Sequence, residues 1–350
     1  MLPTFPEGAM PDDLAGHPAF RRLFMPGRMT LGMMFPMEPL LDHLYPRMDD
    51  QIALAKKVDD AGFGALWFRD VPLYDPEFGD VGQVFDVWVW LATIAAHTKN
   101  IALSTGAMVL PLRHPLHTAK AAASLDILSG GRFILGAASG DRAIEYEAFN
   151  QDHDTRDETF REHVSFYRKA LEECCAEIEN SFGHLTKADL TPKPQSQRIP
   201  LLIVGMARQT LQWIADNADG WVTYPRDPLH QKDRIFQWNQ ARDQRTPGVF
   251  KPFSQSLFID LTDDPDIDPE PIFLGYRLGR NRLLDILKTL ESQGVHHLFF
   301  NLRKSHRPAA EVIDELTETI LPHFPAGASV PVRSMQPFPP DGGHNVTRIL

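Results

Sequence analysis

The chain has 350 residues, of which 43% are hydrophobic and 23% are charged, and its formal net charge is −11 at pH 7. This length suits one large α/β barrel with insertions, and the apolar content is sufficient for a large core. The net negative charge disfavours nucleic acid and anionic membrane as main partners, so we expect a small-molecule ligand.

The chain opens with a segment that has no regular hydrophobic period and then alternates strands with helices. Residues 1–28 are rich in Pro and Gly, so we expect an N-terminal arm over the fold proper, which begins at Met29. Short and almost continuously apolar runs predict strands covered on both faces, at residues 29–35, 65–68, 101–108, 133–137, 201–204, 221–224, 255–261 and 297–302. Apolar residues at a spacing of three to four predict helices at residues 49–61, 86–97, 115–128, 159–179, 208–217, 228–242, 281–293 and 309–321.

Strands and helices in this alternation predict a (β/α)8 TIM barrel, because parallel strands need helical crossovers and eight such units close most naturally into a barrel. A doubly wound open sheet is the structural alternative. The tail after the last predicted helix is again rich in Pro and Gly. We therefore divide the chain into an N-terminal arm at 1–28, a barrel at 29–324 and a C-terminal tail at 325–350.

Two stretches between elements, 139–158 and 262–280, are too long to be simple connections. They follow the fourth and seventh predicted strands, so both lie at the carboxyl end of the barrel, where barrel enzymes place their chemistry. Long loops at this end often act as lids. We expect the acidic run 263–270 to be solvated, whereas Arg277 and Arg280 beyond it, with the neighbouring Tyr276, could reach an acidic substrate.

The third predicted strand ends in the segment STGAMVLPLRHP at residues 104–115. Thr105, Gly106 and Ala107 are small at the point where a barrel mouth would need room for a flat ring. Gly106 could equally relieve a β-bulge. His114 could donate a proton near such a ring, although its place just before a proline also suits the start of a helix.

The fourth predicted strand lies in the segment LSGGRFILGAASGD at residues 128–141 and ends with Ser139 and Gly140. Glycine lets an anion approach the backbone amides closely, and a serine hydroxyl adds a donor, so this end could cradle a phosphate. Ser-Gly at a strand end can also merely turn the chain. Tyr146 in the following loop could cover a cofactor or contact a substrate, or it could be a surface tyrosine of a lid.

The fifth predicted strand repeats this pattern in the segment IVGMARQT at residues 203–210. The strand closes at a glycine, and the last three residues are predicted in the first turn of the next helix, where free amides, the positive helix end and an arginine would converge on an anion. Arg208 could equally be a solvated surface side chain. Two adjacent strand ends that each offer an anion site make a shared phosphate more plausible. The residues assigned to this end are Gly205, Met206, Ala207, Arg208, Gln209 and Thr210.

Together with the ordered barrel pattern, the segments STGAMVLPLRHP and LSGGRFILGAASGD resemble the luciferase-like flavin oxidoreductase and monooxygenase superfamily over residues 29–324. The resemblance implies a non-proline cis peptide behind the flavin ring, which falls here at Gly106–Ala107. It also implies that the flavin phosphate lies by the loops after strands four and five, here Ser139–Gly140 and residues 207–210. The implied cofactor is FMN, and a deazaflavin coenzyme is the alternative within the same fold.

One position departs from the family pattern. Many relatives that oxygenate carbon substrates have a glutamate followed by a histidine after the second strand, whereas this chain has Arg69, Asp70 and Val71. Asp70 could stand in for the acid, but Val71 cannot donate a proton, so a luciferase-type aldehyde reaction is in doubt. Arg69 and Asp70 could recognise the ring or the substrate, or they could form a structural ion pair at the barrel rim.

The resemblance and the small residues at the barrel mouth imply an FMN-dependent monooxygenase or oxidoreductase that acts on an unidentified small organic substrate. The alternatives are a hydride-transfer enzyme that uses deazaflavin and a flavin-binding protein with little turnover. The cofactor would carry the redox chemistry, which agrees with the absence of nucleophile-elbow, Walker, Cys-pair zinc and HExxH motifs, and we expect no metal site. The resemblance also implies a homodimer and a separate flavin reductase as a possible partner.

The sequence favours a cytoplasmic location. The most apolar stretch, 84–96, contains an aspartate and is too short to span a bilayer as a helix. Residues 1–16 lack the basic start and apolar run of a secretory signal. The only cysteines, Cys174 and Cys175, are adjacent in a segment with a helical pattern, and a disulfide between neighbours demands a strained geometry, so we expect reduced thiols.

Overall fold

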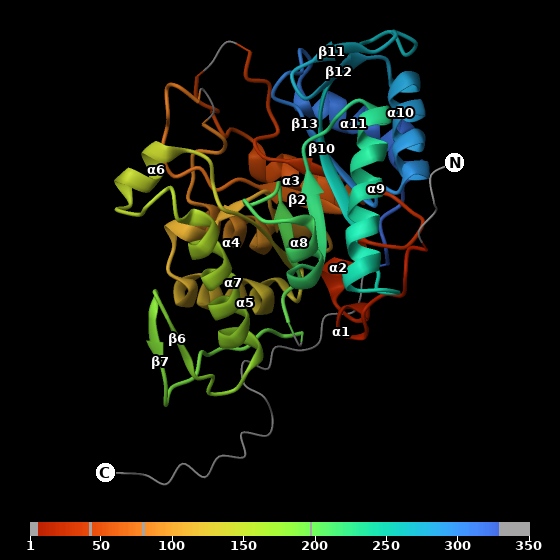
Figure 1. Cartoon of the computed structure of the whole chain (residues 1–350). Coiled ribbons are helices and arrows are strands. Elements are labelled where there is room, and N and C mark those ends of the chain that lie inside the picture. The colour runs from red at the N-terminus through yellow and green to blue at the C-terminus, as the bar shows by residue number, and fades with distance from the viewer. Residues whose placement is uncertain (1–5, 42–43, 79–80, 197, 329–350) are drawn as a thin grey trace.

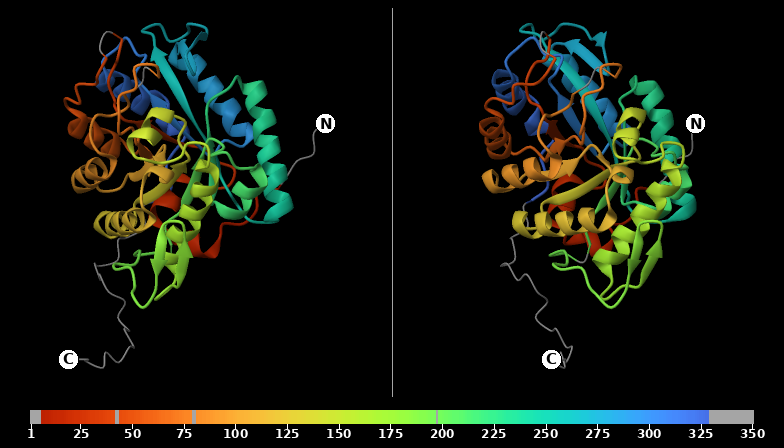
Figure 2. Two further views of the ribbon diagram at one scale, coloured as in Figure 1. Left: turned by 60° about the vertical axis from the view of Figure 1, so that its left-hand side comes forward. Right: turned by 90° about the vertical axis from the view of Figure 1, so that its left-hand side faces the viewer.

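The computed structural model describes residues 6–41, 44–78, 81–196 and 198–328. Eight parallel strands form a barrel surrounded by helices (Figures 1 and 2). The barrel strands are β1 (Thr30–Met34), β2 (Ala65–Phe68), β3 (Ala102–Thr105), β5 (Phe133–Ala138), β8 (Leu201–Val204), β9 (Gly220–Thr223), β10 (Phe253–Leu261) and β13 (His297–Asn301). The helices that follow them are α3 (Gln51–Ala61), α4 (Val87–His97), α5 (Pro115–Ser129), α7 (Arg156–Glu172), α8 (Leu211–Asn217), α9 (Pro228–Arg245), α10 (Arg280–Gln293) and α11 (Ala309–Thr319).

The barrel is closed. Its strands pair in the order β1, β2, β3, β5, β8, β9, β10 and β13, and β13 pairs with β1. This closure confirms the predicted TIM barrel and excludes the doubly wound open sheet. Each predicted strand and helix has a counterpart, and most termini differ by no more than three residues. The hydrophobic runs were informative because these strands are buried on both faces.

Residues 6–28 close the amino end of the barrel. Helices α1 (Asp12–Ala15) and α2 (Pro18–Leu23) lie beside each other in Figure 1. They bring Leu14, Phe20 and Phe24 into one buried cluster with side chains of the barrel interior. The segment was predicted as an arm, because helices of four and six residues are too short to leave a clear hydrophobic period. The division into arm, barrel and tail stays a prediction, and residues 329–350 of the tail lie outside the described residues.

A chain of hydrogen bonds crosses the barrel interior. Trp67 Nε1 donates to His297 Nε2 at 2.9 Å, and His297 Nδ1 is 2.7 Å from the hydroxyl of Thr30. That hydroxyl donates to the carbonyl of Leu23 at 2.8 Å, so it accepts the Nδ1 proton of a neutral imidazole. Complete burial lowers the pKa of His297 to about 3. The network therefore holds a neutral histidine and ties the barrel core to the end of α2.

The helix after the fourth strand is shorter than the predicted 159–179. Helix α7 ends at Glu172, and an antiparallel hairpin of β6 (Ile178–Asn180) and β7 (Gly183–Leu185) follows. The Lys193 ammonium donates to the carbonyls of Ala170 and Glu173 and so satisfies acceptors at the helix end. Both cysteines consequently lie in a loop rather than in a helix.

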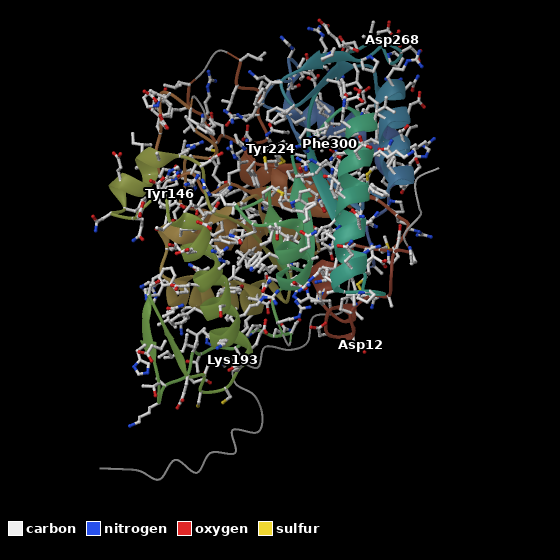
Figure 3. The ribbon with its side chains drawn as sticks, in the orientation of Figure 1. Asp12, Tyr146, Lys193, Tyr224, Asp268 and Phe300 are labelled. Carbon is white, nitrogen blue, oxygen red and sulfur yellow. The ribbon has the colours of Figure 1, made fainter. Side chains whose placement is uncertain are left out.

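The two long loops contain structure of their own. The loop after β5 carries α6 (Ala143–Ala148), and the loop after β10 carries β11 (Glu270–Ile272) and β12 (Gly275–Leu278). In the acidic run, Asp263 and Asp268 expose 95% and 85% of their side chains, as expected for a solvated segment (Figure 3). Within the part of the chain that the structure describes, none of the helices combines the length and the apolar character needed to cross a bilayer.

Candidate active site at the carboxyl end of the barrel

Strand pairing brings three of the predicted site segments together. Strand β5 pairs with β3 and β4 (Met108–Val109) on one side and with β8 on the other, so the turn between β3 and β4 lies beside the segments that follow β5 and β8. These segments hold Gly106–Ala107, Ser139–Gly140 and residues 205–210. Tyr146 and Tyr224, labelled in Figure 3, lie toward this end of the barrel. The predicted neighbourhood of the third, fourth and fifth strand ends is therefore present.

The peptide bond between Gly106 and Ala107 is cis, as the resemblance implies. A Cβ atom on Gly106 would lie 3.1 Å from the indole of Trp67, so only glycine leaves an ordinary contact distance to that ring. The indole in turn stacks on Phe299, with ring centroids 4.2 Å apart and an interplanar angle of 17°. A flat aromatic layer therefore supports the third strand end from inside the barrel.

The Thr105 hydroxyl joins β3 to β5. Its hydroxyl donates to the carbonyl of Gly136 at 2.7 Å and accepts from the amide of Gly136 at 3.0 Å. The side chain is completely buried between β3 and β5. The assignment of the Thr105 side chain to the cofactor site is therefore not supported, because its hydrogen-bonding capacity joins the two strands.

Tyr146 is a buried support for the Ser139–Gly140 turn and is not a surface tyrosine of a lid. The ring is 1% exposed, and its hydroxyl donates to the carbonyl of Ser139. Gly140 has φ +74°, and a Cβ there would lie 2.7 Å from Val109, so glycine is needed for both conformation and packing. The Ser139 hydroxyl makes no hydrogen bond to the described residues, which leaves it available as a donor.

The segment after β8 is a turn that precedes α8, and not the first helical turn that the sequence predicts. Thr210 is the N-cap, and its hydroxyl accepts from the amide of Trp213 at 3.1 Å. Ala207 and Arg208 both have positive φ, and their amides donate to no group among the described residues. The Arg208 side chain is exposed and has no ion-pair partner in the same part of the chain.

Gln209 fixes this turn, whereas Gly205 leaves its backbone open. The Gln209 amide donates to the carbonyls of Asp157 and Ala207, and its oxygen accepts from Arg161. Its side chain therefore docks the turn on α7, and both its oxygen and its amide group are engaged there. Open space surrounds the Cβ position of Gly205, so a ligand could approach its backbone.

Asp70 forms an ion pair at the barrel rim, but with Arg113 rather than with Arg69. Arg113 donates to both carboxylate oxygens at 2.7 and 3.0 Å, and the amide of Val109 donates to one of them at 3.1 Å. The carboxylate is 4% exposed. Asp70 thus holds the segment after the cis peptide, and both of its oxygens are engaged. The backbone amide of Arg69 contacts Gln83 at 3.4 Å.

His114 has the helix-start role that the sequence left open. Its Nδ1 accepts from the amide of Leu116 at 3.2 Å, so it is the N-cap of α5. Its Nε2 then donates to the carbonyl of Phe182 at 2.9 Å. Both imidazole nitrogens of His114 are engaged in these hydrogen bonds. The geometry therefore does not support His114 as a proton donor to a cofactor ring.

Glu145 is a buried acid in α6, in the long loop after β5. It is 3% exposed, and burial raises its pKa to about 7 although Arg142 lies 3.6 Å away. Its Oε1 has no hydrogen-bond partner among the described residues. The guanidinium of Arg142 also lies 4.4 Å from the ring centre of Phe78, which links the loops after β5 and β2.

Sequence reasoning missed a carboxylate and histidine pair at the same end of the barrel. His306 Nδ1 lies 2.7 Å from Asp260 Oδ2, and the His306 amide donates to the other oxygen at 2.9 Å. Asp260 is 4% exposed near the carboxyl end of β10, whereas the His306 side chain is 57% exposed after β13. The only signal was an aspartate near the end of the predicted strand 255–261. Nearby, Arg277 and Arg280 pair with Asp260 and Glu315, so neither is reserved for an acidic substrate.

Large apolar side chains are exposed on the loops at the carboxyl end. They are Leu41, Leu44 and Tyr45 after β1, Leu73, Phe78, Val84 and Phe85 after β2, Ile144 and Phe149 after β5, Met206 after β8 and Tyr224 after β9. The loops at this end therefore present several apolar side chains to solvent.

Comparisons with known proteins agree with this fold. The model of the luciferase-like monooxygenase family matches residues 29–266. An uncharacterised protein of Mycobacterium tuberculosis (strain ATCC 25618 / H37Rv) is 37% identical over 192 residues, which cover 53% of this chain. The match spans 64% of the length of that relative.

Solved structures share the architecture at low sequence identity. An F420-dependent secondary alcohol dehydrogenase in complex with an F420-acetone adduct has a TM-score of 0.69 at 18% identity, over 84% of this chain and 98% of its own. The oxygenating constituent of 3,6-diketocamphane monooxygenase from Pseudomonas putida, in complex with FMN, has a TM-score of 0.67 at 14% identity, over 84% and 98%. At these identities the likeness establishes the fold alone.

Proposed function

Because the chain belongs to the luciferase-like monooxygenase family, we propose that it is an FMN-dependent monooxygenase that acts on a small, largely apolar organic substrate. The observation that carries the proposal is the side-by-side arrangement of the cis Gly106–Ala107 peptide, the Ser139–Gly140 turn and residues 205–210. The exposed apolar rim supports the substrate class.

The unused donors after β5 and β8 fit the phosphate of FMN. Within the part of the chain that the structure describes, the hydroxyl of Ser139, the guanidinium of Arg208 and the backbone amides of residues 207–208 donate to no other group. The Thr210 hydroxyl accepts from Trp213 and can still donate its own proton. Charge-assisted hydrogen bonds from such groups are the strong ones in phosphate recognition. We therefore retain Ser139, Arg208 and Thr210 as phosphate ligands and assign Thr105, Tyr146 and Gln209 to positioning the loops.

The protein supplies orientation and proton handling at this site. When bound, the flavin would supply the redox chemistry that activates oxygen. Asp260 fixes the His306 ring through its Nδ1 proton and leaves Nε2 at the carboxyl end, where it can accept or donate a proton. We propose this pair as the acid–base group in place of the histidine that the chain lacks after β2.

Arg208 gives a direct test of the phosphate assignment. Replacing Arg208 with alanine is expected to raise the Kd of FMN about 10- to 100-fold, because a hydrogen bond to a charged group contributes about 1.5–3 kcal/mol. Fluorescence titration of oxidised FMN measures the change. Arg245→Ala, which removes an exposed arginine paired with Asp216 on the outer helices, is the control and should leave the Kd unchanged. Equal affinity of both variants would remove Arg208 from the site.

His306 is tested with any substrate that supports oxygen-dependent turnover. His306→Gln is expected to lower kcat by about 100-fold, the usual contribution of a general acid or base, without changing the Kd of FMN. A variant with unchanged kcat would assign His306 to the surface of the loop.

A deazaflavin-dependent hydride transfer is the second candidate, and the F420 named for one structural neighbour favours it. Parallel titration with FMN and a deazaflavin, followed by oxygen-consumption measurements, separates the two functions. A flavin-binding protein with little turnover remains the alternative of another class. It would bind FMN and fail to turn over reduced flavin with every organic substrate tested.

The homodimer and the reductase partner stay predictions.

A further inference from the structure

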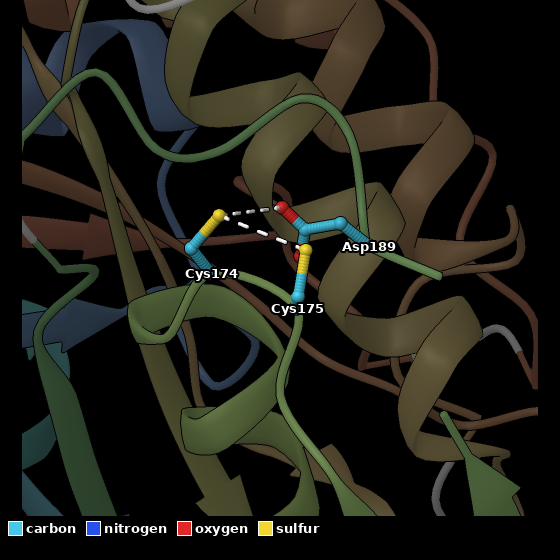
Figure 4. Close-up of side chains that lie close together, drawn as sticks. All are labelled: Cys174, Cys175 and Asp189. Atoms are coloured by element: carbon cyan, nitrogen blue, oxygen red, sulfur yellow. Dashed lines mark hydrogen bonds between the residues drawn. The ribbon is translucent and has the colours of Figure 1, made fainter. Parts of the chain in front are cut away.

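Both cysteines of the chain gather with one aspartate at the far end of the molecule from the barrel mouth. Cys174 and Cys175 follow α7, and Asp189 follows the β6–β7 hairpin (Figure 4). Lys193, which contacts this aspartate, lies in Figure 3 at the end away from Tyr146 and Tyr224. Among the described residues this is the only group of three potential metal ligands whose atoms all lie within 4.8 Å of one another.

The distances in this cluster match the edges of a tetrahedral metal site. The two Sγ atoms are 3.9 Å apart, and Cys174 Sγ lies 3.7 Å from Asp189 Oδ2. Zn²⁺ binds sulfur at about 2.3 Å and carboxylate oxygen at about 2.0 Å, so a tetrahedral angle separates two sulfurs by about 3.8 Å and sulfur from oxygen by about 3.5 Å. Small side-chain rotations would therefore complete three of the four positions, and water can occupy the fourth because the groups are exposed.

The carboxylate is held in place before any ion binds. Lys193 Nζ donates to Asp189 Oδ1 at 2.7 Å while it also donates to the carbonyls at the end of α7. The amide of Leu190 donates to the same Oδ1 at 2.9 Å. These contacts occupy Oδ1 and leave Oδ2 directed at Cys174. Two thiolates and this carboxylate would balance the charges of Lys193 and one divalent ion.

We propose that Cys174, Cys175 and Asp189 form a binding site for a thiophilic divalent cation of the zinc class. Two thiolates and one carboxylate select such an ion over Mg²⁺ and Ca²⁺, which prefer oxygen ligands. Binding replaces the two thiol protons, which leave to solvent, and joins the end of α7 to the segment after the hairpin. The sequence predicts no such site, because the third ligand is separated from the cysteines by the whole hairpin. The site is independent of the proposed FMN function.

Cobalt titration of the reduced, metal-free full chain tests this site. The chain has only two cysteines, so a thiolate-to-cobalt charge-transfer band can arise from this cluster alone, whereas its 14 histidines give no such band. The expected result is one Co²⁺ per chain and loss of the band when Zn²⁺ is added. Cys174→Ser and Cys175→Ser should each lower the affinity at least about 100-fold, and Asp189→Asn about tenfold. Asp268→Asn, a change at an aspartate with an 85% exposed side chain, is the matched control.

Thermal unfolding gives a second readout that does not depend on cobalt. Zn²⁺ should raise the Tm of the native chain by about 3 °C and leave the Tm of both serine variants unchanged, because only the folded native site gains binding energy. Circular dichroism of Cys174→Ser and Cys175→Ser checks that both variants are folded. Three outcomes would overturn the proposal: no charge-transfer band, one ion for every two chains, or full affinity retained in either serine variant.

Discussion

Replacing Asp70 with alanine is expected to lower the free energy of unfolding by about 3–5 kcal/mol, the cost of removing one partner of a buried ion pair. Arg113 would lose both of its short hydrogen bonds to the carboxylate, and the amide of Val109 would lose its acceptor. The segment between the cis peptide and α5 would thus lose its anchor to β2. Urea unfolding at pH 7 measures the stability, and FMN titration of the folded variant should show weaker binding.

An exposed ion pair provides the matched control for this substitution. Lys57 and Asp314 are 2.6 Å apart, but their side chains are 35% and 59% exposed. Asp314→Ala should cost about 0–1 kcal/mol, because water replaces the interaction at an exposed site. If Asp70→Ala is no more destabilising than Asp314→Ala, the Asp70 carboxylate does not hold the rim, and its role as a free acid regains support.

The barrel could be predicted from the sequence because its signal is local. Each strand is a buried apolar run, and each crossover helix has one apolar face, so the alternation is visible in the chain itself. Once the strand order is known, neighbouring strand ends follow, which is why Ser139 and Arg208 could be placed together. The short helices of residues 6–28 could not be predicted from a hydrophobic period in the sequence. Phe20, for example, is buried by contacts with side chains of the barrel interior.

The roles of individual site residues depend on side-chain partners that are distant in sequence. Tyr146 turns inward to Ser139, and Gln209 turns to Asp157, although both were predicted to face a cofactor. The pairs that the sequence did not indicate, Asp70 with Arg113 and Asp260 with His306, join residues 43 and 46 positions apart. Strand periodicity shows which face a residue occupies, but the tertiary fold decides which polar group it meets.

His297 is expected to make the stability of the barrel sensitive to acid. Its pKa is about 3 in the folded chain because of complete burial, and 6.5 is the ordinary value that applies when the chain is unfolded. Below pH 6.5 the unfolded chain therefore binds a proton that the folded chain does not, so the free energy of unfolding falls as the pH falls. This contribution is fully present above pH 6.5 and decreases by about 1.4 kcal/mol for each pH unit down to about pH 3.

The variant His297→Gln separates this contribution from those of other buried groups. At pH 7 it should be about 1–3 kcal/mol less stable than the native chain, because the indole of Trp67 and the hydroxyl of Thr30 lose a partner. From pH 7 to pH 5 the difference in the free energy of unfolding between the two chains should shrink by about 2 kcal/mol. The reason is that only the native chain has a group at this position that binds a proton on unfolding. His230→Gln, at a side chain that is 77% exposed, should keep the native pH dependence. Parallel curves for the native chain and His297→Gln would mean that the imidazole takes up its proton at the same pH in the folded barrel as in the unfolded chain.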